Sequence, residues 1–307
     1  MNKSFFCGLS LFIGIALFST VEIAGKVIAS HATVSPLPMV FARFFVTGIL
    51  LSLIGLFGYI KRYRQQNGND ASLLKLLTAK DIGIFLLNGF LGIFGALYLF
   101  HLGIEMFENA SSSAVVFSAN ALFTCVLAKF INKEELTSRK ILAVIIGLIG
   151  ISCFIFEKGK PTLSTLWAIL TMCGAAMLFA TSVCITKRVV HKYGPVFFMG
   201  MSSLFGSLIT LPSAFIVNGG LQLDAIFQAL PSMCYMVVVG TMLGYLFYYY
   251  GLSGVSAFKA SMAFFMKPGL ACIFAWLYLG NKMNAWTISG TVIIFLAMIL
   301  TLNSKKA

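Results

Sequence analysis

Ten stretches of mainly apolar residues follow one another along almost the whole chain, with only short connections between them. A helix that crosses a lipid bilayer needs roughly 20 such residues. Because the stretches match this length and leave little room for a soluble domain, the sequence predicts an all-α membrane protein with ten transmembrane helices. The predicted helices cover residues 5–29, 36–60, 81–105, 109–131, 138–156, 163–189, 194–217, 231–254, 256–279 and 284–302.

The composition agrees with this prediction. Hydrophobic residues make up 59% and charged residues only 10% of the chain, whereas soluble domains contain roughly 25% charged residues. The first stretch is too long for a signal-peptide core and lacks a small-residue cleavage site, so we expect it to be retained as the first helix. The cysteines all lie in apolar stretches without zinc-type spacing, which indicates packing rather than metal binding.

The Lys and Arg residues are distributed among the short connections and do not form one basic face, so we predict no nucleic-acid partner despite a net charge of +13. If the N-terminus is cytoplasmic, the outer side holds only Lys158, Lys160 and Lys282. The positive-inside rule then places both termini and residues 61–80 in the cytoplasm, and residues 218–230 outside. The cytoplasmic side holds Lys3, Lys61, Arg62, Arg64, Lys75, Lys80, Lys129, Lys133, Arg139, Lys140, Lys187, Arg188, Lys192, Lys259, Lys305 and Lys306.

A repeat relates the two halves of the chain. The sequence LFST at residues 17–20, followed by Lys26, recurs as LFAT at residues 178–181, followed by Lys187. Further matched pairs are Pro36 and Pro195, Gly92 and Gly240, Gly103 and Gly251, Phe117 and Phe264, Cys125 and Cys272, and Ala128 and Ala275. Each repeat has five predicted helices, an odd number, so the two repeats (residues 1–160 and 161–307) must be inverted relative to each other. Secondary transporters with inverted repeats bind their substrate at the repeat interface.

With these features the chain resembles the drug/metabolite transporter superfamily of EamA type over nearly its whole length. The resemblance lies in LFSTVEIAGK (residues 17–26), PLPMVFARFF (residues 36–45) with its Arg43, residues 110–151, and their echo at residues 256–283. Family members usually have a Pro in helix 4 where this chain has Ala121. The resemblance implies a ten-helix permease of the inner membrane that moves a small metabolite, often outward, without indicating which metabolite.

Motifs for catalysis are absent from the sequence, which contains no H-E-x-x-H, no G-x-S-x-G and no glycine-rich phosphate loop. His101 and Glu105 lie one helical turn apart, but two ligands are too few for a metal site. We therefore expect neither an enzyme nor a cofactor nor a bound metal.

Glu22 stands in an almost entirely apolar run, roughly 10 Å below the outer end of helix 1 at the rise of an α-helix. A charge at mid-membrane costs roughly 2.5 to 3.5 kcal/mol on insertion scales and usually faces a cavity or a partner. In one interpretation Glu22 forms a static pair with Arg43 or with Lys26. In the other it faces the outer half of the cavity near Arg43, and binds a cationic group or exchanges a proton. For Lys26, which can reach the outer surface, and for Arg43 we expect a structural or gating role.

Asn120 and Lys267 occupy equivalent positions of the two repeats, near the middle of helices 4 and 9. Pro268 follows Lys267 and leaves a backbone carbonyl without its helical donor, which is typical of a binding site in a broken helix. We predict that both side chains contact the substrate. Glu22 and Lys267 differ in depth by roughly 8 Å at the helical rise, so a zwitterionic substrate such as an amino acid is expected to bridge them.

Aromatic and small residues give two further predictions. Tyr98 and His101 of helix 3 and Tyr248 of helix 8 are candidates for the cavity wall, although a Tyr near a helix end is often an interfacial anchor. The spacings from Gly92 to Ala96 and from Gly240 to Gly244 indicate close helix contacts.

The predicted function is alternating-access transport of a small polar or amphipathic metabolite, with amino acids as the preferred class, export as the direction and a proton or ion gradient as a candidate driving force. Besides the small-molecule substrate, membrane lipids are the expected partners. Two alternatives are a flippase for a lipid or lipid-linked molecule and a membrane receptor without transport. The repeat argues against a receptor, which has no need of two equivalent gates.

Overall fold

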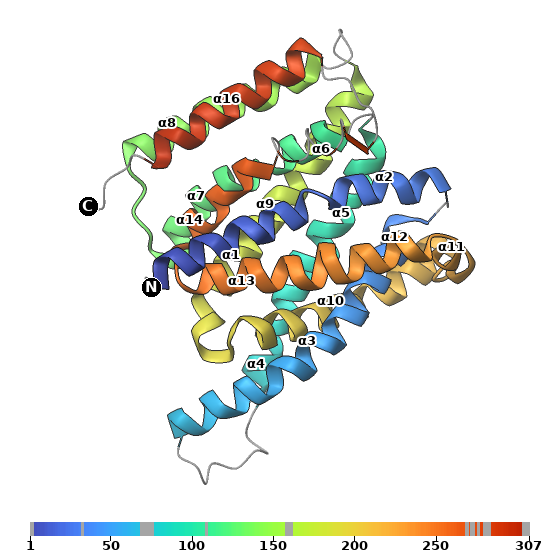
Figure 1. The fold of residues 1–307 in the computed structure, drawn as a ribbon, viewed down its shortest axis with the longest axis vertical. Coiled ribbons are helices and arrows are strands. Elements are labelled where there is room, and N and C mark those ends of the chain that lie inside the picture. The colour runs from blue at the N-terminus through green and yellow to red at the C-terminus, as the bar shows by residue number, and fades with distance from the viewer. Residues whose placement is uncertain are drawn as a thin grey trace.

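The computed structural model describes residues 3–31, 34–67, 77–107, 110–156, 162–267, 270, 274, 277–278 and 284–302, and every element within them is a helix (Figure 1). The elements are α1 (Lys3–Phe18), α2 (Val21–His31), α3 (Pro36–Asn67), α4 (Ala79–Gly89), η2 (Phe90–Gly95), α5 (Ala96–Met106), α6 (Ala110–Phe117), α7 (Asn120–Asn132), α8 (Ser138–Ser152), η3 (Cys153–Phe156), α9 (Leu163–Tyr193), α10 (Pro195–Asn218), α11 (Leu223–Gln228), α12 (Leu230–Tyr235), η4 (Met236–Leu243), α13 (Gly244–Ser253), α14 (Ala257–Met262), η5 (Ala263–Phe265) and α16 (Ala285–Leu302).

Among these residues, seven helical segments are long and apolar enough to cross a membrane, so the chain is a multi-pass membrane protein. They are Phe6–Ile28, Pro36–Gln65, Ala79–Met106, Ser112–Asn132, Leu163–Tyr193, Pro195–Asn218 and Leu230–Ser253. These segments correspond to predicted helices 1–4 and 6–8. Predicted helix 5 falls on α8 and η3, helix 10 falls on α16, and helix 9 begins at α14 and η5 and continues into residues that are described only in part. The count of ten stays a prediction.

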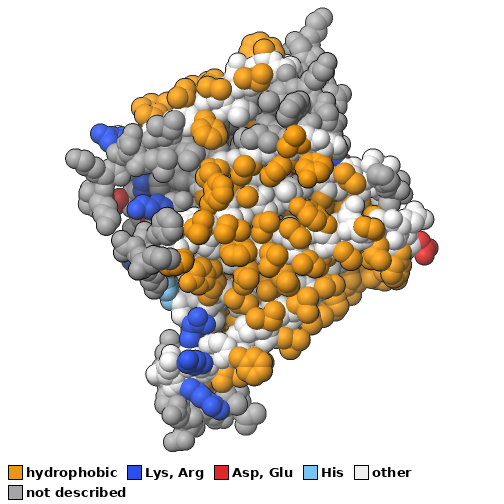
Figure 2. Space-filling view, in the orientation of Figure 1, with side chains coloured by type: hydrophobic (Ala, Val, Ile, Leu, Met, Phe, Trp, Pro, Cys, Tyr) orange, Lys and Arg blue, Asp and Glu red, His pale blue; other side chains and the backbone are white. Residues whose placement is uncertain are grey.

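Large apolar side chains cover the outside of the molecule. Phe57 is 80% exposed and Ile216 is 84% exposed, which is unfavourable in water and normal against lipid. Figure 2 shows a continuous apolar face over α1, α13, α10 and α3. The Lys and Arg side chains visible in that view gather mostly at the end where both chain termini lie. Acidic side chains are visible both there and at the opposite end, where α11 begins with Asp224 in its first turn.

Three of the predicted transmembrane helices are interrupted in the structure. Helix 1 breaks at Ser19 and Thr20, whose hydroxyls donate to the carbonyls of Ile15 (2.8 Å) and Leu17 (2.8 Å). Such local side-chain bonds compete with the helical backbone bonds and bend helices. Helix 4 breaks between α6 and α7, and helix 9 tightens into the 3-10 segment η5.

The breaks of helices 4 and 9 touch each other. The hydroxyl of Ser118, at the first break, donates to its own helix at Ala114 O (2.8 Å) and to Phe264 O in η5 (3.0 Å). Helix 4 is therefore interrupted at this point although it carries Ala121 where the family usually has a Pro. The bond of Ser118 to Ala114 O competes with the helical backbone bonds and can bend a helix that has no proline there.

Helices 3 and 8 each contain a π-helical segment at the position that the repeat makes equivalent, η2 with Gly92 and η4 with Gly240. π-Segments inside α-helices occur often at functional sites. Both glycines meet a neighbouring helix closely, because a Cβ on Gly92 would lie 2.3 Å from Ser182 Oγ and one on Gly240 would lie 2.9 Å from Val21 Cγ2. The predicted close contacts are confirmed at both positions.

The helices pack in pairs. The most extensive contacts join α3 to α10, α1 to α13, α8 to α16, α5 to α9 and α7 to α9, while α14 packs against α7 (Figure 1). The close packing of α3 against α10 depends on glycines, since a Cβ on Gly55 would lie 2.5 Å from Phe197 N and one on Gly200 would lie 2.3 Å from Ser52 N. This arrangement surrounds one central region where the three helix breaks lie together.

Candidate functional site

The centre of the site is an ion pair between Glu22 and Lys267. Glu22 lies in the first turn of α2, just after the break of helix 1, and Lys267 lies two residues after η5, just after the break of helix 9. The Lys267 ammonium contacts the Glu22 carboxylate, and both side chains are shielded from solvent. The expected separation of roughly 8 Å is therefore wrong, because the rise of a continuous helix does not apply across two broken ones.

Aromatic rings complete the surroundings of Lys267. Its ammonium lies over the rings of Phe100, 5.0 Å from the centroid, and Phe117, 4.8 Å from the centroid. A cation over an aromatic face is attracted by the ring quadrupole, and more strongly away from water. One carboxylate and two rings therefore hold this lysine in place.

Arg43 of α3 lies near enough to Glu22 for the two charges to attract each other, but its hydrogen bonds go to other residues. Its Nε donates to Thr241 Oγ1 in η4 at 2.7 Å, and its Nη1 lies 2.7 Å from His101 Nε2 in α5. Because a guanidinium can only donate, His101 Nε2 is the acceptor, and the imidazole is the neutral tautomer with its proton on Nδ1. The guanidinium carbon also lies 5.0 Å from the centroid of the Phe44 ring. Arg43 thus ties helices 2, 3 and 8 together.

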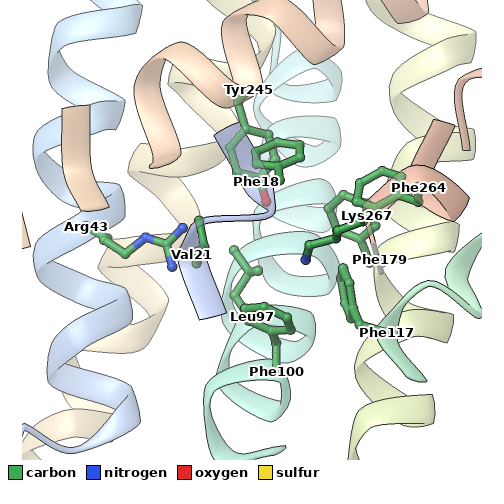
Figure 3. Close-up of a pocket in the computed structure, with 10 residues that line it drawn as sticks. All are labelled: Phe18, Val21, Arg43, Leu97, Phe100, Phe117, Phe179, Tyr245, Phe264 and Lys267. Atoms are coloured by element: carbon green, nitrogen blue, oxygen red, sulfur yellow. The ribbon is translucent and has the colours of Figure 1, made fainter. Parts of the chain in front are cut away.

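Arg43 and Lys267 line one small central cavity of about 20 Å³. Figure 3 shows both cationic groups directed toward it from opposite sides. This volume holds about one water molecule, so the centre is closed. The other lining residues are Phe18, Val21, Leu97, Phe100, Phe117, Phe179, Tyr245 and Phe264.

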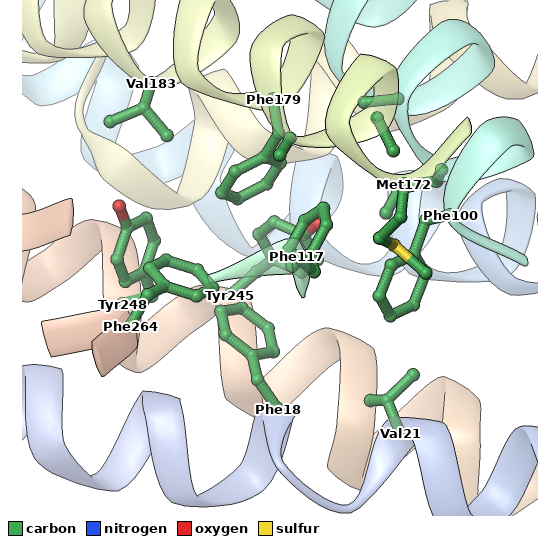
Figure 4. Packing of buried hydrophobic residues seen from close by; sticks show 14 of the residues in the cluster. Phe18, Val21, Phe100, Phe117, Met172, Phe179, Val183, Tyr245, Tyr248 and Phe264 are labelled. Carbon is green, nitrogen blue, oxygen red and sulfur yellow. The ribbon is translucent and has the colours of Figure 1, made fainter. Parts of the chain in front are cut away.

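Six of these lining residues form what we call the aromatic cluster: Phe18, Phe100, Phe117, Phe179, Tyr245 and Phe264 (Figure 4). Phe18 and Phe264 stack with centroids 5.9 Å apart, and Phe117 and Phe179 lie 5.5 Å apart. The repeat signal contained four of these residues, because LFST and LFAT align Phe18 with Phe179 and the other match aligns Phe117 with Phe264. Sequence reasoning used them only to recognise the repeat and did not identify them as the cavity wall. It also missed Thr241 and Tyr245, which lie one helical turn apart.

The remaining predicted cavity residues have different positions. Asn120 begins α7 at the break of helix 4, is fully buried, and donates through Nδ2 to Phe117 O (2.9 Å). Its Oδ1 has no hydrogen-bond partner among the described residues. Tyr248 is buried beside the cavity, with its ring 5.3 Å from that of Phe264. Tyr98 is half-buried and stacks on Phe94, outside the cavity lining.

Lys26 has a structural position. It donates to Phe107 O at the C-terminal end of α5, where the free carbonyls and the helix dipole favour a cation. Its repeat equivalent Lys187 makes the same kind of bond, to Leu252 O (3.1 Å) and Ser253 O (3.4 Å) at the end of α13. Pro268, predicted to free a carbonyl near Lys267, lies outside the described residues.

No group of three or more His, Cys, Asp or Glu side chains in the described part of the chain is arranged to hold a metal ion. What the site offers is an ion pair, an arginine with neutral partners and an apolar aromatic wall. Such a site can bind and orient a small charged molecule.

Two larger hollows lie toward opposite ends of the protein. One, of about 540 Å³, includes Thr20, Val27 and Tyr235; the other, of about 500 Å³, includes Cys7, Arg62 and Gly194.

Comparison with known proteins agrees with this architecture. A protein of Clostridium kluyveri (strain ATCC 8527 / DSM 555 / NBRC 12016 / NCIMB 10680 / K1), named as an uncharacterized transporter, is 29% identical over 300 residues, which cover 94% of this chain and 90% of the relative. The uncharacterized transporter YdfC of Bacillus subtilis (strain 168) is 27% identical over 72% of this chain and 71% of its own.

A solved crystal structure has the same fold, with a TM-score of 0.68 over 96% of both chains at 12% identity. The model of the EamA-like transporter family matches two stretches of the sequence, residues 6–156 and residues 166–303. The two stretches fall on the two halves of the chain and together take in Glu22, Arg43 and Lys267. The protein therefore belongs to the EamA-like transporter family and is a membrane transporter.

Proposed function

We propose that the protein is a secondary transporter that moves a small polar or amphipathic metabolite by alternating access, with the substrate bound at Glu22, Arg43 and Lys267. The observation that carries this proposal is the buried ion pair at the point where helices 1, 4 and 9 are interrupted. Ionisable residues inside a membrane mark transport pathways, and interrupted helices that meet at the midplane are the binding sites of repeat-built transporters.

Two inverted repeats, residues 1–160 and residues 161–307, are part of the proposal. A two-fold axis in the membrane plane relates helix 2 to helix 7 and helix 5 to helix 10, so these pairs can meet at the axis. It also makes the contact of helix 1 with helix 8 recur between helices 6 and 3. The pairs α3 with α10, α8 with α16, α1 with α13 and α9 with α5 follow this pattern. The equivalent π-segments, the bonds of Lys26 and Lys187, and the two family matches support it as well.

Alternating access is supported by the closed centre. The cavity of about 20 Å³ has no room for a metabolite, whereas the hollows of about 540 and 500 Å³ toward the two ends have the size of small-molecule sites. Opening one of them as far as the ion pair would expose the site to one side of the membrane only. This conformation is then the occluded state.

We place the protein in the inner membrane with both termini and residues 61–80 in the cytoplasm, and residues 218–230 outside. The gathering of Lys and Arg side chains at the end with both termini supports this orientation (Figure 2). Export is the proposed direction. Glu22 is the buried carboxylate of the site and the candidate proton carrier. It faces Lys267, which belongs to helix 9. The ionisable groups on the adjoining helices are Arg43, His101 and Tyr245.

Amino acids and related zwitterions are the first candidate substrates, since a carboxylate can meet Arg43 and Lys267 while an amine meets Glu22.

Metabolite profiling of the medium of cells with and without the protein, followed by uptake in proteoliposomes, tests the function. A flippase would move labelled lipid in the same vesicles, and a receptor would move nothing. Loss of transport in Lys267→Met, with normal membrane insertion, is the expected result.

A further inference from the structure

The charges of the described ionisable groups at the centre of the site do not cancel. Glu22 and Lys267 neutralise each other, and His101 is neutral because its Nε2 accepts from Arg43. Arg43, which is only 2% exposed, carries a permanent charge and has a hydroxyl, an imidazole and an aromatic ring as its partners. The described residues of the site therefore hold one excess positive charge inside the membrane.

The excess charge acts on the cavity itself. The cavity lining contains two cations, Arg43 and Lys267, whereas Glu22 is not among the lining residues. The aromatic cluster supplies the rest of the wall together with Val21 and Leu97, and none of these residues offers a carboxylate (Figure 3). A buried charge is costly unless it is paired, so this wall favours a ligand that brings one negative charge and an apolar body.

We propose that the substrate is a small organic anion whose acidic group binds between Arg43 and Lys267 and whose apolar part packs against the aromatic cluster. This proposal rests on the proposed function, and within the small polar or amphipathic metabolites it ranks organic anions above the zwitterions named first. The fork of a guanidinium matches a carboxylate with two parallel bonds, and the Lys267 ammonium closes the other side. In the empty site Glu22 supplies the carboxylate that Lys267 needs, and the substrate competes with it.

The net charge of the occupied site differs between an anion and a zwitterion. With a bound anion the net charge is zero, with a bound zwitterion it is plus one, and with a bound cation it is plus two. An amino group would also need Glu22, which already contacts Lys267. A free carboxylate is therefore required of the substrate, and an amino group is not.

The test uses four probes of one carbon skeleton, hexanoate, norleucine, hexylamine and hexanamide, and follows thermal unfolding of the purified full-length protein. Hexanoate should raise the unfolding temperature most, norleucine less, and the amine and amide not at all. Arg43→Gln should weaken hexanoate binding at least about tenfold, as for loss of a charged hydrogen bond. Arg188→Gln, at an exposed arginine, is the control that should leave hexanoate binding unchanged.

Glu22→Gln keeps the test decisive if Arg43→Gln fails to fold. It leaves Lys267 without its carboxylate, so hexanoate should stabilise this variant more than the wild type. Equal or stronger binding of norleucine, hexylamine or hexanamide, or no binding of any probe, overturns the proposal. Flux in proteoliposomes, corrected for passive leakage through empty liposomes, tests the transport function separately from the anion site. If an anion binds but is not moved, the transport function is refuted and the anion site is not. If an amine or amide is moved, the anion site is refuted and the transport function is not.

Discussion

The Glu22 carboxylate and the Lys267 ammonium meet across two helix breaks, one in each half of the chain. Neither side chain can reach water from its position, so the energy of each charge depends on the other. Any movement that separates helix 1 from helix 9 must replace this contact by another one. The pair is therefore both a structural bond and the part of the site that has to open.

Removing one member of the pair should destabilise the protein more than removing both. Glu22→Gln or Lys267→Met each leaves a buried charge without its partner, which costs about 3–5 kcal/mol in comparable cases. The double variant leaves no charge and should recover a large part of this loss. Thermal unfolding of the three variants in the same detergent measures the coupling. Strictly additive losses would show that the contact contributes nothing.

Arg43→Lys should reduce transport at least about tenfold with little effect on expression, because an ammonium cannot reproduce the two directed bonds of a guanidinium. Thr241→Val removes only the Nε partner and should have a smaller effect. Initial rates with the substrate identified by metabolite profiling provide the measurement, and Arg188→Lys at an exposed position is the matched control. Full activity of Arg43→Lys would mean that only charge, and not geometry, matters here.

The membrane segments could be predicted from the sequence because apolar runs of the right length are a one-dimensional signal. The repeat was visible for the same reason, and it contained Phe18, Phe117, Phe179 and Phe264. The partners of the charged residues could not be predicted, because they depend on where helices break. Ser19 and Ser118 interrupt their helices by bonds to carbonyls, and neither position carries a Pro or Gly that would have indicated a break.

The error at Glu22 has the same origin. The rise of a straight helix places Glu22 near Arg43, with which it does interact, but it also places Glu22 away from Lys267, which the ion pair contradicts. Helix 1 is interrupted at Ser19 and Thr20, just before Glu22, and η5 interrupts helix 9 two residues before Lys267. Arg43 then binds Thr241 in a π-segment, a local geometry that no hydropathy pattern reveals.

The orientation predicts opposite labelling of two exposed positions. In a background without cysteines, Gln65→Cys should react with an impermeant thiol reagent only after the cells are opened, and Asp224→Cys should react in intact cells. Both native side chains are exposed in the structure, so accessibility differs only by the side of the membrane. The reverse pattern would place both termini outside the cytoplasm.

Gly92→Ala should lower stability by about 1–3 kcal/mol, the usual cost of overpacking. The added Cβ would lie 2.3 Å from Ser182 Oγ and 2.8 Å from Ser182 Cβ, and Ser182 donates to Asn88 Oδ1 at 2.9 Å, so relief of the clash breaks that bond. Gly83→Ala is the control, since a Cβ there has no atom within 4 Å and alanine favours the helix. Equal unfolding temperatures of the two variants would contradict the close contact of η2 with α9.

Asp81 should matter more than the lysine that pairs with it. Its Oδ1 accepts from Tyr193 OH (2.5 Å) and Lys192 Nζ (2.5 Å), and its Oδ2 accepts from Thr78 N (2.9 Å). One carboxylate therefore joins α9 to the start of α4, at the end we place in the cytoplasm. The Asp81 side chain is 3% exposed and that of Lys192 is 51% exposed. Asp81→Asn should therefore cost about 1–3 kcal/mol, because buried donors lose a charged acceptor, whereas Lys192→Gln should cost less than about 1 kcal/mol, as for a solvent-exposed pair. The loss of stability in Tyr193→Phe should lie between those of the other two variants.

Thermal unfolding of the three variants gives the order of these losses directly. A loss of stability in Lys192→Gln as large as that in Asp81→Asn would mean that the ion pair, and not the buried carboxylate, holds this end of the protein together.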